Sequence, residues 1–166
     1  TTDVVCMAGV DNGAGNREWQ IQPEAGGKFA WGNDKFRRVP ASTYDVEHIT
    51  ASVDTTDATV TTLATIPISA NYTYQIEVAV AARRTGGTAG TADDGASYRR
   101  LAGYTTKSST VTPLGSVQTL GTDAEDQAGW DVTLTESGTN VLVRVTGAID
   151  NNISWLGDIT VRRVSS

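Results

Sequence analysis

The chain has 166 residues, with 13 basic and 19 acidic side chains that give a formal net charge of −6. This length suits one domain, or one domain with an added arm. The acidic balance and the scattered basic pairs argue against nucleic-acid binding, which needs clustered Lys and Arg. No apolar run approaches the roughly 18 residues that span a bilayer, so we expect no membrane insertion.

The composition favours strands over helices. The sequence contains 25 Thr and 17 Gly, and β-branched and turn residues at this level are typical of sheets joined by tight turns. Cys6 is the one cysteine, so the chain has no internal disulfide, and its apolar surroundings predict a small buried side chain. The sequence therefore predicts an all-β protein.

Residues 1–43 are predicted to form a short β-rich N-terminal arm or shaft segment. Glycine-rich bursts separate its expected strands, which are Val4–Val10, Arg17–Gln22, Lys28–Trp31 and Lys35–Val39. Strands this short cannot cover their own large aromatic side chains, so we expect the following domain or another copy of the chain to cover them. These side chains are Trp19, Phe29, Trp31 and Phe36. Pro40–Ser42 is expected to be a linker.

Residues 44–166 carry the pattern of a head domain built from strands. In the stretch from Tyr74 to Ala82 the even positions are apolar, while Gln75 and Glu77 lie between them, and this period of two predicts a half-buried strand. The expected strands are Val46–Val53, Ala58–Ile66, Thr73–Arg84, Ala96–Thr106, Thr110–Leu120, Trp130–Thr135, Asn140–Thr146 and Ile153–Val164. About eight strands separated by turn residues predict an antiparallel β-sandwich that is jelly-roll-like.

The same alternation predicts the core of the sandwich. The side chains expected to be buried are Ile76, Val78, Val80, Trp130, Val143 and Trp155. Two connections are expected to differ from tight turns. Thr85–Gly95 is expected to be a long, exposed polar loop. Thr122–Gly129 is expected to form one short turn of helix, because Asp123, Glu125 and Asp126 suit a first helical turn.

Few residues suit catalysis or metal binding. His48 is the one histidine and has no nucleophile motif beside it, so we interpret it as a strand or interface residue. The acidic pair Asp93 and Asp94 and the group Asp123–Asp126 are carboxylates of the kind that cleave glycosidic bonds, yet they lie in polar sequence typical of solvated loops. Their spacing also lacks the alternation of a calcium loop. We therefore expect no catalytic residue, no metal and no cofactor, and a protein that is not an enzyme.

Aromatic side chains offer a better signal for binding. Trp130 and Trp155 fall on the apolar face of their strands, whereas two tyrosines stand among basic residues and are expected at the surface. Sugars are commonly bound by exposed aromatic rings beside acids and amides. The predicted glycan-binding residues are Tyr98, Arg100, Tyr104, Asp93 and Asp94.

Several groups of residues carry a family resemblance. They are Asp54–Val60, Thr73–Val78 with Ala81–Arg84, Gly95–Tyr98, and Leu142–Gly147 with Ile153–Trp155. With these groups, the stretch from Val53 to Val164 resembles the β-sandwich modules found toward the C-termini of tailed-phage virion proteins, mainly tail fibres and related appendages. The first forty residues resemble the Gly-punctuated β repeats of fibre shafts.

The resemblance implies a bacteriophage protein at the virion surface, on a tail fibre or another appendage. It implies a homotrimer that contacts other virion proteins and attaches to a host cell-surface glycan, which makes the head a receptor-binding domain. It carries over no catalytic residue. Two alternatives stay open: a purely structural trimerisation or capsid-decoration module, and a glycan-cleaving depolymerase domain.

Overall fold

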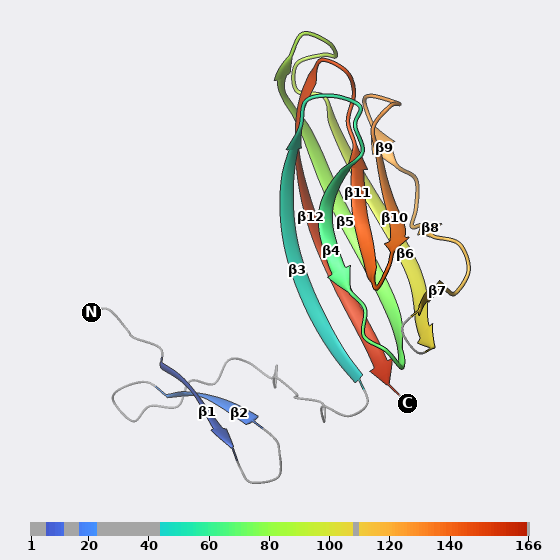
Figure 1. Ribbon diagram of the computed structural model, residues 1–166. Helices are drawn as coiled ribbons and strands as arrows, with labels where there is room; N and C mark the ends of the chain where they lie inside the picture. Colours follow the sequence, from blue (N-terminus) through green and yellow to red (C-terminus); the bar gives the residue numbers. More distant parts are fainter. Residues whose placement is uncertain (1–5, 12–16, 23–43, 108–109, 166) are drawn as a thin grey trace. The chain divides into compact units, whose positions relative to one another are not determined.

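Every element in the computed structural model, which describes residues 6–11, 17–22, 44–107 and 110–165, is a β-strand (Figure 1). The chain divides into two units, Thr1–Tyr44 and Asp45–Ser166. In the first unit, β1 (Cys6–Asp11) pairs antiparallel with β2 (Arg17–Gln22). The two further strands and the linker expected before residue 44, and the aromatic side chains expected to need cover there, lie outside the description.

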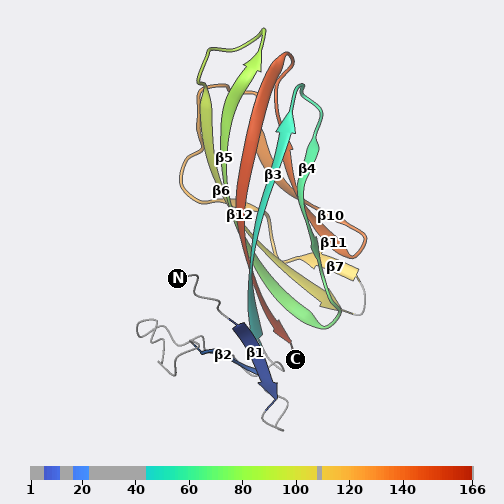
Figure 2. The ribbon, with the colours of Figure 1, turned by 90° about the vertical axis from the view of Figure 1, so that its left-hand side faces the viewer.

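The second unit is a sandwich of two antiparallel sheets, which Figure 2 shows as two layers. The larger sheet has the strand order β3 (Tyr44–Thr55), β12 (Asn151–Ser165), β5 (Tyr72–Gly87), β6 (Gly95–Lys107) and β7 (Thr110–Pro113), and the short strands β8 (Gln118–Thr119) and β9 (Ala124–Glu125) also pair with β6. The smaller sheet has the order β10 (Asp131–Ser137), β11 (Asn140–Thr146) and β4 (Thr61–Pro67). The prediction of an all-β antiparallel β-sandwich is confirmed.

The connections set which strands become neighbours. β5 and β6 are consecutive neighbours in the larger sheet, and β10 and β11 are consecutive neighbours in the smaller one. The chain changes sheets from β3 to β4, from β4 to β5, from β9 to β10 and from β11 to β12. These changes of sheet bring β12, the last strand, between β3 and β5, the earliest strands of its sheet. The core therefore closes only when both ends of the domain are in place.

The core lies between the two sheets and follows the period-two pattern. The six side chains predicted to be buried are all at most 2% exposed, which confirms that prediction. They are joined there by Tyr74, Ile153 and Ile159 from the larger sheet and by Val141 and Val145 from the smaller. Alternating residues of facing strands therefore fill one continuous apolar layer.

A β-bulge fits the smaller sheet to this core. The register between β11 and β4 shifts between Val143 and Arg144, and Leu63 and Ala64 are both buried as a result. Leu63 reaches the larger sheet at Gly157, where an added Cβ would stand 2.7 Å from Leu63 Cδ2. Glycine at this position therefore lets the two sheets approach.

Two expectations about residues 110–129 are wrong. The strand expected over Thr110–Leu120 is broken, because Gly115 adopts a φ of 97° between β7 and β8. The helical turn expected at Thr122–Gly129 is absent from that described segment, where Ala124–Glu125 instead forms β9 along β6. Asp123, Glu125 and Asp126, the acids that suit a first helical turn, instead accept hydrogen bonds from residues of β6.

Candidate functional site

The predicted glycan-binding residues of β6 lie inside the sandwich. Tyr98, Arg100 and Tyr104 occupy even positions of β6, whose side chains face the core, and they are 1%, 6% and 0% exposed. The expectation that the two tyrosines are surface residues is therefore wrong. A side chain with almost no accessible surface cannot contact a sugar, so these three residues belong to the core rather than to a binding face, and Tyr98 and Arg100 take part in a buried polar network.

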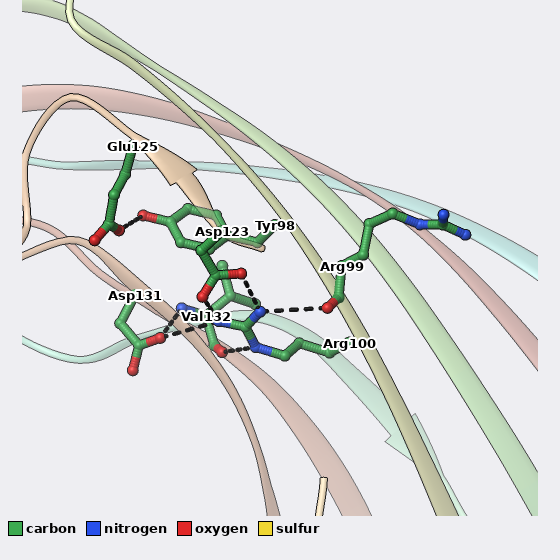
Figure 3. A network of polar contacts seen from close by, with 7 residues as sticks. All are labelled: Tyr98, Arg99, Arg100, Asp123, Glu125, Asp131 and Val132. Atoms are coloured by element: carbon green, nitrogen blue, oxygen red, sulfur yellow. Dashed lines mark hydrogen bonds and ion pairs between the residues drawn. The ribbon is translucent and has the colours of Figure 1, made fainter. Parts of the chain in front are cut away.

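Arg100 is the centre of this network (Figure 3). Its Nη1 and Nη2 atoms donate to both carboxylate oxygens of Asp123, at 2.5 and 2.8 Å, and its Nε donates to the carbonyl of Val132 at 2.9 Å. A weaker contact of 3.4 Å reaches Asp131, whose side chain is half exposed. The hydrogen bonds to Asp123 raise the pKa of Arg100 further above its ordinary value. Neutralisation by Asp123 allows a guanidinium to lie in the core.

Asp123 belongs to residues 114–129, which we call the strap because they run along β6. Backbone hydrogen bonds join the strap to β6 at three places: Leu114 N to Gly103 O (2.8 Å), Leu120 N to Arg99 O (3.0 Å) and Asp126 N to Gly95 O (3.1 Å). Side chains add to them, since Tyr98 Oη donates to Glu125 at 2.7 Å and Gly95 N donates to Asp126 at 2.9 Å. Asp123, Glu125 and Asp126 thus hold the strap against β6.

Tyr98 also begins an aromatic stack in the core. Its ring stacks on Trp155 with 6.3 Å between centroids, and Trp155 tilts against Trp130 at 5.8 Å. Trp155 Nε1 donates to Thr55 Oγ1 at 2.9 Å. Burial, followed by the hydrogen bond to Glu125, raises the pKa of Tyr98 well above its ordinary range. The stack joins β6, β12 and the start of β10 across the sandwich.

Tyr104 lies farther along the same face of β6. Burial raises the pKa of Tyr104 to about 12, and the charge of Glu136 adds to this effect. A neutral phenol therefore persists in the core over the physiological pH range.

The two acids of the long loop have separate structural roles. Asp94 is buried, and its Oδ2 accepts hydrogen bonds from Thr91 N and Gln127 Nε2, both at 2.7 Å. Asp93 is exposed, adopts a φ of 70° and forms an ion pair with Arg83. The loop is thus held by its own side chains at the end of the sandwich where the turn before β12 also lies (Figure 1).

Arg84 joins that turn to the loop. Its Nε donates to Asn151 Oδ1 at 2.9 Å and to Ala89 O at 2.8 Å. Ala89 N in turn donates to Asp150 O at 3.1 Å. Most of the loop is exposed, as expected, and these hydrogen bonds join it to the turn before β12.

The outer face of the larger sheet carries a group of paired charges centred on Glu77. Arg99 and Arg162 both contact Glu77, at 2.7 and 3.4 Å, and the hydrogen bond from Arg99 lowers the pKa of Glu77. His48 lies on exposed β3, where its Nδ1 is 3.2 Å from Thr160 Oγ1. The structure therefore places His48 in a strand, beside the hydroxyl of Thr160.

The carboxylates of the long loop and of the strap all have partners within the fold. Asp93, Asp94, Asp123, Glu125 and Asp126 each accept hydrogen bonds from the chain itself. Over the described ranges no three His, Cys, Asp or Glu side chains gather as metal ligands would. No helix in the described part of the chain is long and apolar enough to cross a membrane.

Comparison with known proteins gives only distant likenesses. No family model and no curated protein matches the sequence. In structure, the chain is similar to part of the tailspike of Acinetobacter baumannii bacteriophage Fri1, a capsular polysaccharide depolymerase, with a TM-score of 0.39 and 13% identity over 70% of this chain and 17% of that one. The chain is also similar to part of the tailspike of Acinetobacter baumannii phage AM24, with a TM-score of 0.36 and 10% identity over 73% of this chain and 26% of that one. For the tailspike of Acinetobacter phage vB_ApiP_P1 the TM-score is 0.35 and the identity 17%, over 85% of this chain and 26% of that one. The chain thus spans about a quarter or less of the length of these tailspikes.

Proposed function

We propose that this chain is an attachment module of a phage virion appendage, which binds a host surface glycan without cleaving it. The sequence resemblance to the β-sandwich modules of phage virion proteins supports this proposal. One structural observation carries it furthest. The loop carboxylates that could serve in cleavage accept hydrogen bonds from the chain itself, while the outward side chains of the smaller sheet include several threonines.

The outer face of the smaller sheet illustrates this character. Thr62 and Thr65 on β4 and Thr133 and Thr135 on β10 belong to the outward set of their strands, because the residues that alternate with them are buried. Hydroxyl groups both donate and accept hydrogen bonds, so they match the hydroxyls of a sugar. Such a face can bind a polysaccharide, and the threonines described on it supply no pair of acids for cleavage.

A binding and cleavage assay tests the proposal. The purified protein is applied to an array of bacterial surface polysaccharides, and any polysaccharide that it binds is then incubated with it while reducing ends are measured. We expect binding and no increase in reducing ends. An increase would identify a depolymerase, and an absence of binding would favour a structural or capsid-decoration module.

A further inference from the structure

Arg144 differs from the other arginines whose side chains the structure describes. Arg83, Arg99, Arg100 and Arg162 form ion pairs with carboxylates, and others bind carbonyls, an amide or an aromatic ring. Among these described side chains, Arg144 alone has no hydrogen bond or ion pair, and its Nε is buried without a partner. A half-buried guanidinium without a counter-charge costs free energy, so its presence needs another explanation.

The position of Arg144 is the centre of an open sheet face. It lies on β11, the middle strand of the smaller sheet, opposite Thr133 on β10 and Thr62 on β4. Leu142, two residues earlier, lies opposite Thr135 and Thr65 in the same way. We call these six residues the Arg144 face.

The β-bulge in β4 shapes this face. In a regular strand Thr62 and Thr65 would point to opposite sides, because three positions separate them. The extra residue at Leu63 and Ala64 turns both of those side chains inward and leaves both threonines exposed. Thr135 Oγ1 is a second buried polar atom without a partner, so two such atoms belong to this one face.

The carboxylate that shares the outward side of β10 with Thr133 and Thr135 already has partners. Asp131 lies opposite Thr146, and its Oδ1 accepts the backbone N–H of Val132 at 2.7 Å while contacting Arg100 at 3.4 Å. The guanidinium of Arg144 therefore remains available to an anion from outside the described residues. Its planar fork matches a carboxylate, which takes two parallel hydrogen bonds.

We propose that the Arg144 face binds a carboxylate-bearing glycan, with Arg144 holding the carboxylate of an acidic sugar and the exposed Thr62 and Thr65 contacting neighbouring sugar hydroxyls. This inference rests on the proposed function and names its ligand class. A second copy of the chain fits the face less well, because stable interfaces between copies have apolar centres. The exposed large apolar side chains, among them Val46, Leu114, Leu156 and Val164, lie outside β4, β10 and β11.

The net charge of −6 gives the chain no general attraction to an acidic polysaccharide. Recognition therefore depends on local contact at the Arg144 face. The affinity of one copy is expected to be weak, and several copies on one appendage would raise it by effective concentration.

Binding measurements with matched variants test the inference. Wild type, Arg144→Gln, Arg144→Lys and Arg99→Gln are compared on oligosaccharides that carry glucuronic or galacturonic acid and on the same oligosaccharides after chemical reduction of their carboxyl groups. Arg99→Gln makes the same change of charge on the outer face of the larger sheet. We expect Arg144→Gln to weaken binding of the acidic oligosaccharides about ten-fold or more. Arg144→Lys should weaken it less, and Arg99→Gln should leave it unchanged.

Thermal unfolding gives an independent readout. Because Arg144 has no partner among the described residues, Arg144→Gln should leave the unfolding midpoint unchanged or raise it, so lost binding cannot be blamed on lost folding.

The other outcomes overturn the inference in distinguishable ways. Equal binding of acidic and reduced oligosaccharides by wild type and Arg144→Gln would leave glycan attachment standing and exclude the Arg144 face. No binding of either set by wild type, where the polysaccharide array is also negative, would remove both proposals. A change of molecular mass in light scattering for Arg144→Gln alone would make the face an interface between copies.

Discussion

Trp155 shows how one side chain can join several parts of the fold. It contacts the ring of Tyr98, the ring of Trp130 and the hydroxyl of Thr55, and it is 1% exposed. We expect Trp155→Ala to lower the free energy of unfolding by about 3 to 5 kcal/mol, because the cavity left by an indole cannot be refilled by stacked neighbours. Denaturant unfolding measures this. A loss below about 1 kcal/mol would mean that the site collapses or that the ring contributes little.

A narrower substitution separates the hydrogen bond from the packing. Thr55→Val keeps the volume of the buried side chain but leaves the indole N–H of Trp155 without its acceptor. We expect a loss of about 1 to 3 kcal/mol, smaller than that of Trp155→Ala.

Tyr104 gives the domain a pH dependence in alkaline solution. Its pKa is raised to about 12 in the folded chain, whereas an unfolded tyrosine ionises near pH 10. The unfolded state therefore loses its proton first, so the stability that Tyr104 contributes is complete below about pH 10 and is lost as the pH rises toward 12. We expect Tyr104→Phe to reduce the loss of stability over this interval, measured by denaturant unfolding at a series of pH values. The same curve for both proteins would contradict this.

At the scale of elements, the strap depends on one buried charge. Asp123 meets Arg100 with two hydrogen bonds, and the Arg100 side chain is only 7% exposed, whereas Asp131 is 51% exposed and contacts it at 3.4 Å. We expect Asp123→Asn to cost about 2 to 3 kcal/mol, since it leaves a core guanidinium without its main counter-charge. Asp131→Asn, the matched control, should cost less than about 1 kcal/mol.

Limited proteolysis locates the effect of this change. If the strap is held chiefly by Asp123, cleavage within residues 114–129 should become faster in Asp123→Asn before the rest of the domain unfolds. Equal stability losses in the two variants, or unchanged cleavage of the strap, would show that its backbone bonds to β6 suffice.

At the scale of the whole molecule, we predict a homotrimer. The arm sequence contains Trp19, Phe29, Trp31 and Phe36, the strands predicted for them from the sequence are too short to bury them, and a symmetric assembly would cover such side chains. Light scattering of the full chain should give three times the mass of the monomer. A truncation beginning at Ala41 should weaken association, because it removes these aromatic residues. A stable monomer at micromolar concentration would contradict the prediction.

The sequence by itself determined most of the long strands and much of the core. Period-two alternation located β5, β6, β11 and β12 within a few residues and identified Trp130 and Trp155 as core, because a strand that is buried on one side must alternate. Which face of β6 is buried was harder to predict. Its inward set includes Arg100, and a charged residue ordinarily indicates the solvent side.

Only the tertiary structure decided which charged side chains have partners and which residues those partners are. Asp123, Glu125 and Asp126 suit a helix start locally, yet Arg100, Tyr98 and the backbone of Gly95 offer them partners from a distant strand. Alternation around Val141, Val143 and Val145 already places Arg144 on the outside of β11, but nothing local shows that it lacks a counter-charge. The apolar alternation of a strand can be recognised from neighbouring residues, because it depends only on local spacing. The partner of a charged side chain depends on strands that come into contact only after the chain has folded.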